Sequence, residues 1–205
     1  MRRKDFLKKL HKEMKYVARV SRVDLDLLRP FTCSGNPLKC EVILVGINPA
    51  TPIKGLFKKC WNKKKLSFDK TKFNAVYAEA RGGEAPSEKS YRHKIGVLVG
   101  KLKRSSRSVL ETNLWPIPTA ARNQLTPEHE MAGMGCLRLL LKANTHWRLI
   151  VAMGVDAGMR FELSPPNEVL FCDHPTHVGG NWDSKKIASE IRKRFRKGKI
   201  RRPGA

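Results

Sequence analysis

Two polar side chains of this sequence are each followed directly by a proline, and both could take part in chemistry. Asn48 stands in the segment GINPATP, and His174 stands in HPTHVGG. Proline fixes its own φ angle and restricts the residue before it, so each side chain is held in one orientation, as a preorganised site requires. Either dipeptide alone is typical of a turn. Together, each after a predicted strand, they favour a functional site.

The amide of Asn48 limits the chemistry that this residue could perform. An amide can orient a water molecule, but it is a poor general base and cannot remove the proton of that water effectively. A reaction that used Asn48 in this way would depend on stabilising the leaving group more than on activating the nucleophile. It would therefore be slower than the same reaction with an aspartate at this position.

Four short apolar runs predict the strands that would position these side chains. Their β-branched character is typical of strands buried on both faces, and they cover residues 41–46, 108–113, 147–154 and 168–173. Helical patterns lie between them, and strands that alternate with helices pair in parallel under right-handed crossovers. We therefore predict an α/β fold, a three-layer α/β/α sandwich around a central, mainly parallel four-stranded sheet.

Five helices are predicted from apolar residues at helical spacing. An amphipathic helix with lysines on its polar face should run from about Asp5 to Arg19. Another should run from about Pro127 to Lys142, with Thr126 as its N-cap and proline at the first helical position. The other three are expected at 91–102, at 156–161 and from residue 183 or 184 onward.

In such a sheet, ligands bind beyond the carboxyl ends of the strands. Four segments are therefore candidates for the site, and they cover residues 46–52, 113–118, 154 and 174–180. The chain has neither a GxGxxG nor a GxxxxGK[ST] phosphate loop, and it has no GxSxG elbow. These absences argue against a nucleotide-binding protein or a small α/β hydrolase.

The chain is strongly basic, with 42 Lys and Arg against 18 Asp and Glu and a formal net charge of +24. Much of this excess must lie on the surface, where it attracts a polyanion. DNA is the first expectation, RNA the second and an anionic membrane surface the third. A merely solubilising surface is the alternative interpretation. The segment from about residue 197 onward is expected to be a basic tail.

Length and composition favour one intracellular domain spanning residues 1–205. The chain has no secretory pattern and no apolar stretch near the roughly 20 residues of a membrane span. We expect a monomer that is cytoplasmic and nucleoid-associated, or nuclear in a eukaryote. The five cysteines are far apart and form no CxxC pair, so we expect reduced thiols, no metal and no cofactor. A metal or iron–sulfur site assembled in three dimensions is the alternative.

Three motifs in this order resemble the uracil-DNA glycosylase superfamily. GINPA at 46–50 is similar to motif I, nearest to the mismatch-specific uracil/thymine-DNA glycosylase branch. HPT at 174–176 is similar to motif II, and ETN at 111–113 resembles the strand end whose asparagine reads the base. The resemblance extends from about residue 40 to 195. It implies a DNA-repair enzyme that flips a nucleotide out of the stack and hydrolyses the N-glycosidic bond of uracil, leaving an abasic site.

The resemblance also implies roles for individual residues. Asn48 would position the attacking water, and His174 would hydrogen-bond the oxygen of the departing pyrimidine, where negative charge develops. Asn113 would pair with the edge of the base, or it would only satisfy backbone groups at the strand end. The other residues expected to bind the base are Gly46, Ile47, Pro49 and a stacking aromatic, Phe57 or Trp61. The residues expected to bind DNA are Thr176, His177, Val178, Lys58, Lys59 and Arg122.

Two of these assignments have equally plain alternatives. Phe57 and Trp61 lie among lysines, a pattern that suits a base-stacking platform beside phosphates, yet each is equally compatible with the core. His177 and Val178 occupy the position of the loop that enters the minor groove in the family. An ordinary surface loop is the alternative.

Departures from the family pattern leave the branch and the base open. Ala50 stands where relatives usually have glycine, and the segment after motif II differs from their Ser-Pro-Leu-Ser type of loop. The cysteine spacing of the iron–sulfur branches and the arginine-rich insertion of the covalent branch are missing. The alternatives are a glycosylase for hypoxanthine, xanthine or mismatched thymine, or a catalytically weak module that binds damaged DNA.

Overall fold

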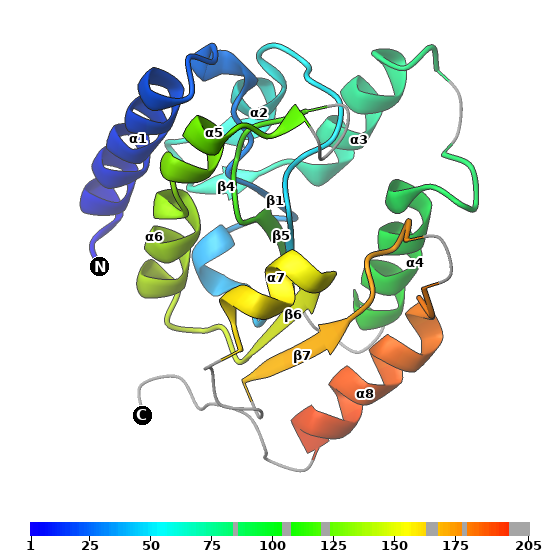
Figure 1. Cartoon of the computed structure of the whole chain (residues 1–205). Helices are drawn as coiled ribbons and strands as arrows, with labels where there is room; N and C mark the ends of the chain where they lie inside the picture. The colour runs from blue at the N-terminus through cyan, green and yellow to red at the C-terminus, as the bar shows by residue number, and fades with distance from the viewer. Residues whose placement is uncertain (84–85, 104–107, 120–123, 163–167, 178–179, 197–205) are drawn as a thin grey trace.

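A computed structural model describes residues 1–83, 86–103, 108–119, 124–162, 168–177 and 180–196. At its centre lies a five-stranded sheet in the order β1-β5-β2-β6-β7 (Figure 1). Four strands pair in parallel, and they are β2 (Val42–Gly46), β5 (Val109–Asn113), β6 (Leu149–Met153) and β7 (Val169–Cys172). These are the four predicted strands, so the α/β class and the mainly parallel sheet are confirmed.

The predicted count of four strands is wrong, because β1 (Phe31–Cys33) adds a fifth. It pairs antiparallel with β5, with Phe31 opposite Thr112. With three residues, this strand is too short to give a periodic pattern in the sequence. Its existence depends on the neighbouring strand, which supplies its hydrogen-bond partners.

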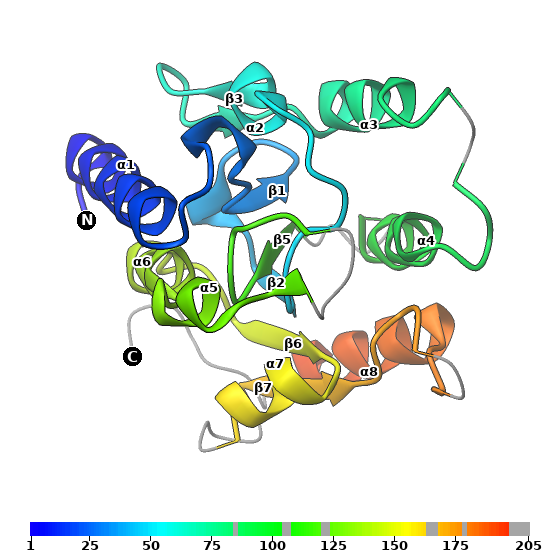
Figure 2. The same ribbon diagram turned by 45° about the horizontal axis from the view of Figure 1, so that its top comes forward.

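Helices lie on both faces of the sheet, and the central strand β2 shows why. Side chains of a strand point alternately to opposite faces, and all of those in β2 are buried. Val42 and Leu44 pack in a cluster with α4 (Tyr91–Lys103) and α8 (Ser184–Arg196). Ile43 and Val45 pack in a second cluster, with α1 (Arg3–Val20) and α6 (Gly135–Ala143). Figure 2 shows these two pairs of helices on opposite sides, an arrangement compatible with the predicted three-layer sandwich.

The helix predicted over residues 127–142 is interrupted in the structure. It consists of α5 (Pro127–Met131) and α6, because Gly133 between them has a left-handed φ of 74°. Its predicted start is confirmed, since the side chain of Thr126 accepts a hydrogen bond from the backbone N–H of His129. The helices predicted near residues 5, 91, 156 and 183 are also present, as α1, α4, α7 (Val155–Arg160) and α8.

A layer of aromatic side chains covers β1, and it comes from elements that the sequence did not predict. Phe57 and Trp61 are 5% and 9% exposed and pack edge-on against the ring of Phe31, with centroid distances of 5.0 and 5.3 Å. Phe68 and Phe73 extend the cluster. The elements that carry it are α2 (Leu56–Cys60), β3 (Trp61–Asn62), β4 (Ser67–Phe68) and α3 (Lys70–Glu79). Two short 3-10 turns, Leu25–Leu27 and Pro37–Lys39, complete the described elements.

The strand order reverses at β2, because β5 lies on one side of it and β6 on the other. In open α/β sheets a ligand crevice forms at such a reversal, beyond the carboxyl ends of the strands. Gly46 at the end of β2 pairs in register with Asn113 at the end of β5. The fold therefore brings two of the predicted motifs side by side. Within the described residues, no helix has both the length and the apolar character needed to cross a membrane.

Candidate functional site

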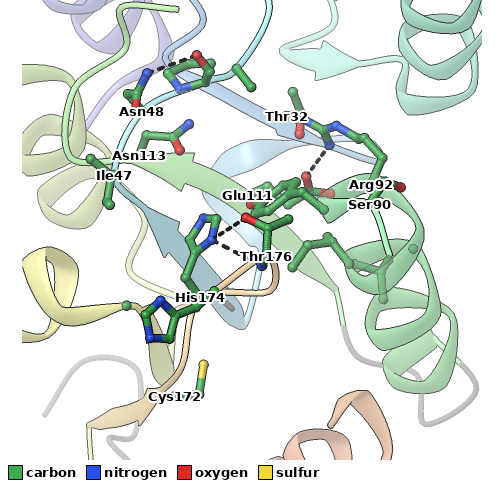
Figure 3. A pocket seen from close by; sticks show the side chains of 18 of the residues that line it. Thr32, Ile47, Asn48, Ser90, Arg92, Glu111, Asn113, Cys172, His174 and Thr176 are labelled. Carbon is green, nitrogen blue, oxygen red and sulfur yellow. Dashed lines mark hydrogen bonds and ion pairs between the residues drawn. The ribbon is translucent and has the colours of Figure 1, made fainter. Parts of the chain in front are cut away.

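A cavity of about 1780 Å³ opens at the carboxyl edge of the sheet. It exceeds the roughly 300–1,000 Å³ of a typical small-ligand pocket. Asn48, Asn113 and His174 all line it, although they come from three separate segments of the chain (Figure 3). The fold thus brings together the three residues on which the sequence analysis relied.

The side chain of Asn48 is held by the segment that follows β5. Its amide nitrogen Nδ2 donates to Thr119 Oγ1 at 2.7 Å and to the Pro49 carbonyl at 3.2 Å. The backbone N–H of Thr119 also donates to the Pro49 carbonyl, at 3.0 Å. This network assigns the amide orientation. With Nδ2 engaged, the acceptor Oδ1 is the atom suited to bind a water molecule.

A glycine at position 46 makes room for Asn113. A Cβ atom at Gly46 would lie 2.9 Å from Asn113 Oδ1, which is closer than such contacts normally allow. A side chain at position 46 would therefore displace the amide of Asn113 from the position it has in the structure. Gly154, after β6, has the same relation to His174, because a Cβ there would lie 3.2 Å from the Cβ of the histidine.

The imidazole of His174 is fixed by two neighbours. The backbone N–H of Thr176 donates to Nδ1 at 3.3 Å, and Thr176 Oγ1 lies 3.0 Å from the same nitrogen. The ring stacks on Tyr91 with centroids 5.6 Å apart. Burial, and then the nearby His177, lower the pKa of His174 below 6.5. The histidine is therefore neutral at pH 7, with its proton on Nε2.

The loop after β2 is strained and is held by buried side chains. Thr51 has a left-handed φ of 59°, a region that β-branched residues rarely adopt. Arg29 donates through Nη2 to the carbonyls of Ala50 and Thr51, and Tyr77 donates its hydroxyl hydrogen to Thr51 Oγ1 at 3.2 Å. Strain of this kind persists only where the surroundings enforce it, and it is concentrated at functional sites.

A buried ionic cluster forms another wall of the cavity. Glu111, in the interior of β5, binds Lys70 Nζ at 2.6 Å and Arg92 Nη1 at 2.7 Å. Figure 3 shows the pair of Glu111 and Arg92. Lys70 also donates to Thr32 Oγ1 at 2.9 Å. Burial would raise the pKa of Glu111, but the two cations outweigh it and lower that pKa to about 2. Burial lowers the pKa of Lys70 to about 8, against the opposing effect of Glu111.

The other predicted site residues are found in different surroundings. Ile47, Pro49, Thr176 and His177 line the cavity. Gly46 does not line it, but a Cβ at this position would approach Asn113 and Tyr91, which do. Phe57 and Trp61 are core residues of the aromatic layer and do not line it. The exposed side chains on α2 also lie outside the lining, and they are Lys58 and Lys59. Val178 and Arg122 fall outside the described residues, as does the basic tail from residue 197.

Several lining residues were not identified from the sequence, chief among them Arg29, Lys70, Tyr77, Arg92 and Thr119. One signal was available, because Glu111 is a carboxylate in the middle of a strand predicted to be buried. Such a residue is almost never buried without a partner. The identity of its partners was not readable, since Lys70 lies 41 positions away in the sequence.

Within the described parts of the chain, no group of three or more His, Cys, Asp or Glu side chains is arranged to hold a metal ion. No protein-family model matches the sequence, and a search of curated proteins gives no significant match. The chemistry of the cavity is therefore the basis for assigning a function.

Proposed function

We propose that this protein is a monofunctional DNA glycosylase that hydrolyses the N-glycosidic bond of uracil in DNA. The single observation that carries the proposal is the convergence of Asn48, Asn113 and a neutral His174 on one cavity. Two amides and an imidazole that donates through Nε2 suit a ligand with alternating carbonyl and N–H groups, which is the edge that uracil presents. The resemblance of GINPA, ETN and HPT to the uracil-DNA glycosylase superfamily supports the same assignment.

In this proposal the flipped nucleotide enters the cavity, and Asn113 pairs with the edge of its base. A water held by Asn48 Oδ1 forms a bond to C1′ of the sugar, while the bond from C1′ to the base nitrogen breaks. The electron pair of that bond leaves with the base, and one proton of the water is lost to solvent. His174 Nε2–H donates to the base oxygen on which negative charge develops.

The neutral state of His174 suits this role. A neutral donor stabilises a developing anion without first requiring a buried cation, which is costly to maintain without a partner. The stabilisation is also preorganised, because Thr176 and Tyr91 hold the ring before any substrate is bound. Leaving-group stabilisation is the larger contribution here, since Asn48 cannot act as an effective general base.

The charge of the protein supports DNA as the substrate. A formal net charge of +24 favours binding to the phosphate backbone without regard to sequence. The proposed location is intracellular, where DNA is present. The role of Asn48 does not require a second subunit, and we propose a monomer.

A single-turnover excision assay tests the proposal. The substrates are matched oligonucleotides with U:G, U:A, single-stranded U, T:G and hypoxanthine, and the reference is an identical duplex without a modified base. We expect release of free uracil and an abasic site, with Asn48→Ala losing most of the excision while still binding DNA. Preferential release of thymine or hypoxanthine would reassign the base. Tight binding without excision of any base would instead favour a damaged-DNA-binding module.

A further inference from the structure

Three guanidinium groups surround one buried phenol ring in the wall of the cavity. Tyr77, on α3, is 7% exposed. The guanidinium carbons of Arg92, Arg29 and Arg81 lie 5.3, 5.7 and 5.8 Å from the centroid of its ring. All four side chains line the cavity. We call these residues the Tyr77 cluster.

The positive charge of the Tyr77 cluster is only partly compensated. Glu111 pairs with Arg92, but its other oxygen is already bound to Lys70. Each oxygen of this carboxylate therefore has a cation of its own. The ion pairs of this carboxylate are with Lys70 and Arg92. The charge of Arg92 also acts on the buried Arg29, and close like charges are unfavourable where water is largely excluded.

Arg29 carries the clearest sign of a missing partner. It is 2% exposed, and its Nη2 donates to the carbonyls of Ala50 and Thr51. Its Nε and Nη1 are buried and have no hydrogen-bond partner among the described residues. A buried donor without a partner costs free energy, more so when it belongs to a charged group. Burial first, and then the charge of Arg92, lower the pKa of Arg29 to about 10.

We propose that the Tyr77 cluster binds a phosphate group. A tetrahedral oxyanion can accept hydrogen bonds from several guanidinium groups at once, and arginine matches phosphate geometry through paired N–H donors. The anion would offset the mutual repulsion of the three arginines, whose side chains all line the cavity.

The position of the cluster suggests whose phosphate it is. Arg29 donates a hydrogen bond to the carbonyl of Ala50, two residues after Asn48. The anion would therefore lie in the same cavity as the side-chain amide of Asn48. The cavity of about 1780 Å³ has room for more than a base. The phosphate is therefore assigned to the nucleic-acid substrate, either as a backbone phosphodiester or as a terminal monophosphate. This assignment, unlike the anion site itself, rests on the proposed function.

Thermal unfolding with inorganic phosphate tests the anion site without any excision chemistry. Sodium phosphate is titrated against sodium chloride of matched ionic strength. We expect a saturable rise in melting temperature with phosphate alone, because a ligand that binds only the folded state stabilises it. Arg81 is exposed, so Arg81→Gln should fold normally. It should raise the apparent dissociation constant for phosphate about tenfold or more, as expected for loss of a charged hydrogen bond.

A matched control separates this site from general effects of charge and salt. Lys12→Gln removes one exposed positive charge from α1, outside the cavity, and should leave phosphate binding unchanged. Arg29→Lys keeps the charge but loses the paired donors, and it should also weaken binding. A rise that does not saturate, or one that is equal in the wild type and in Arg81→Gln, would overturn the proposal.

Two nucleotide probes then distinguish the source of the phosphate. Deoxyuridine 5′-monophosphate carries a terminal phosphate, whereas a trinucleotide with central deoxyuridine and unphosphorylated ends carries only phosphodiesters. Stabilisation that depends on Arg81 with the first assigns a terminal group, and with the second it assigns the backbone. Binding of inorganic phosphate but of neither nucleotide would overturn the nucleic-acid assignment. Because this assay requires no bond cleavage, loss of the anion site and failure of the glycosylase proposal are separate outcomes.

Discussion

The backbone N–H of Thr176 donates a hydrogen bond to Nδ1 of His174 at 3.3 Å. An imidazole nitrogen that accepts a hydrogen bond carries no proton, so the proton of the neutral ring must be on Nε2. The HPT motif thus fixes both the position of the histidine and its tautomer. It does so through a main-chain group, which a substitution at residue 176 leaves in place.

The pH dependence of excision should follow the protonation of His174. Its folded pKa is lowered from 6.5, so the ring is neutral above that value and gains a proton only at lower pH. Protonation adds a hydrogen at Nδ1, which breaks the bond from Thr176. Single-turnover rates measured over about pH 5 to 8 should therefore have an acid limb below 6.5. His174→Ala should lower the rate about 10²- to 10³-fold, the usual cost of losing one oxyanion donor.

The same shift has a consequence for stability. Because the folded state binds the His174 proton more weakly than the unfolded state, the stability contribution is present above 6.5 and is lost as pH falls through the folded pKa. His146→Gln is the matched control, since it removes an exposed imidazole outside the cavity. If the acid limb of the excision rate were unchanged in His174→Ala, the assignment would be contradicted. The rate of His146→Gln should keep the wild-type acid limb.

Thr119 should act as a positioning residue for Asn48. Thr119→Val keeps the shape of the side chain but removes the acceptor at 2.7 Å from Asn48 Nδ2. We expect single-turnover excision to fall about tenfold to a hundredfold, because small misplacements of a catalytic group are costly, with DNA affinity unchanged. Thr119→Ser should restore the rate. Equal losses in both variants would mean that the hydroxyl does not orient the amide.

Glu111 should be the costliest single carboxylate in the site for folding. Glu111→Gln leaves Lys70 and Arg92 buried without a full counter-charge, which should lower the free energy of unfolding by about 3–5 kcal/mol in urea titrations. Glu190→Gln is the comparison. Its carboxylate pairs with Arg194 at 3.2 Å and is 38% exposed, so the loss should be about 1 kcal/mol or less. Similar losses in the two variants would contradict this account.

The stability of the protein at acid pH should report the ionisation of Glu111. The pKa of Glu111 is depressed from 4.5 to about 2, so its contribution is fully present above 4.5 and is lost as pH falls toward 2. Unfolding free energies measured across this window should fall steeply in the wild type. The slope should be shallower in Glu111→Gln, which has no proton to bind there.

DNA binding should weaken steeply with salt. With a formal net charge of +24, binding by phosphate neutralisation predicts a linear fall of log K with log salt, amounting to about 10³- to 10⁵-fold between roughly 50 and 200 mM for 6–10 phosphate contacts. Fluorescence anisotropy with an undamaged duplex gives the slope. If Lys58 and Lys59 contact phosphates from the exposed face of α2, the slope should decrease by about one for each Lys→Gln change. An affinity insensitive to salt would argue against DNA as the partner.

The four strands of the parallel sheet and the segments that follow them were predictable from the sequence. Their buried β-branched runs give a local signal, and in parallel strands the carboxyl ends meet at one edge. The position of Asn48, Asn113 and His174 at that edge follows from chain order alone. The capping residue Thr126 was readable for the same reason, because its hydrogen-bond partner lies three residues away.

Tertiary structure alone decided what surrounds these residues. The pattern of aromatics among lysines did not reveal that Phe57 and Trp61 pack in the core. The burial of these two side chains depends on β1, a strand too short to give a recognisable pattern in the sequence. The partners of Glu111 and the two carbonyls held by Arg29 are 19 to 41 positions distant in sequence. Such contacts depend on how helices and strands pack, for which no local period exists. The sequence therefore determined which groups could do chemistry, and the packing decided the charge, tautomer and orientation with which they meet.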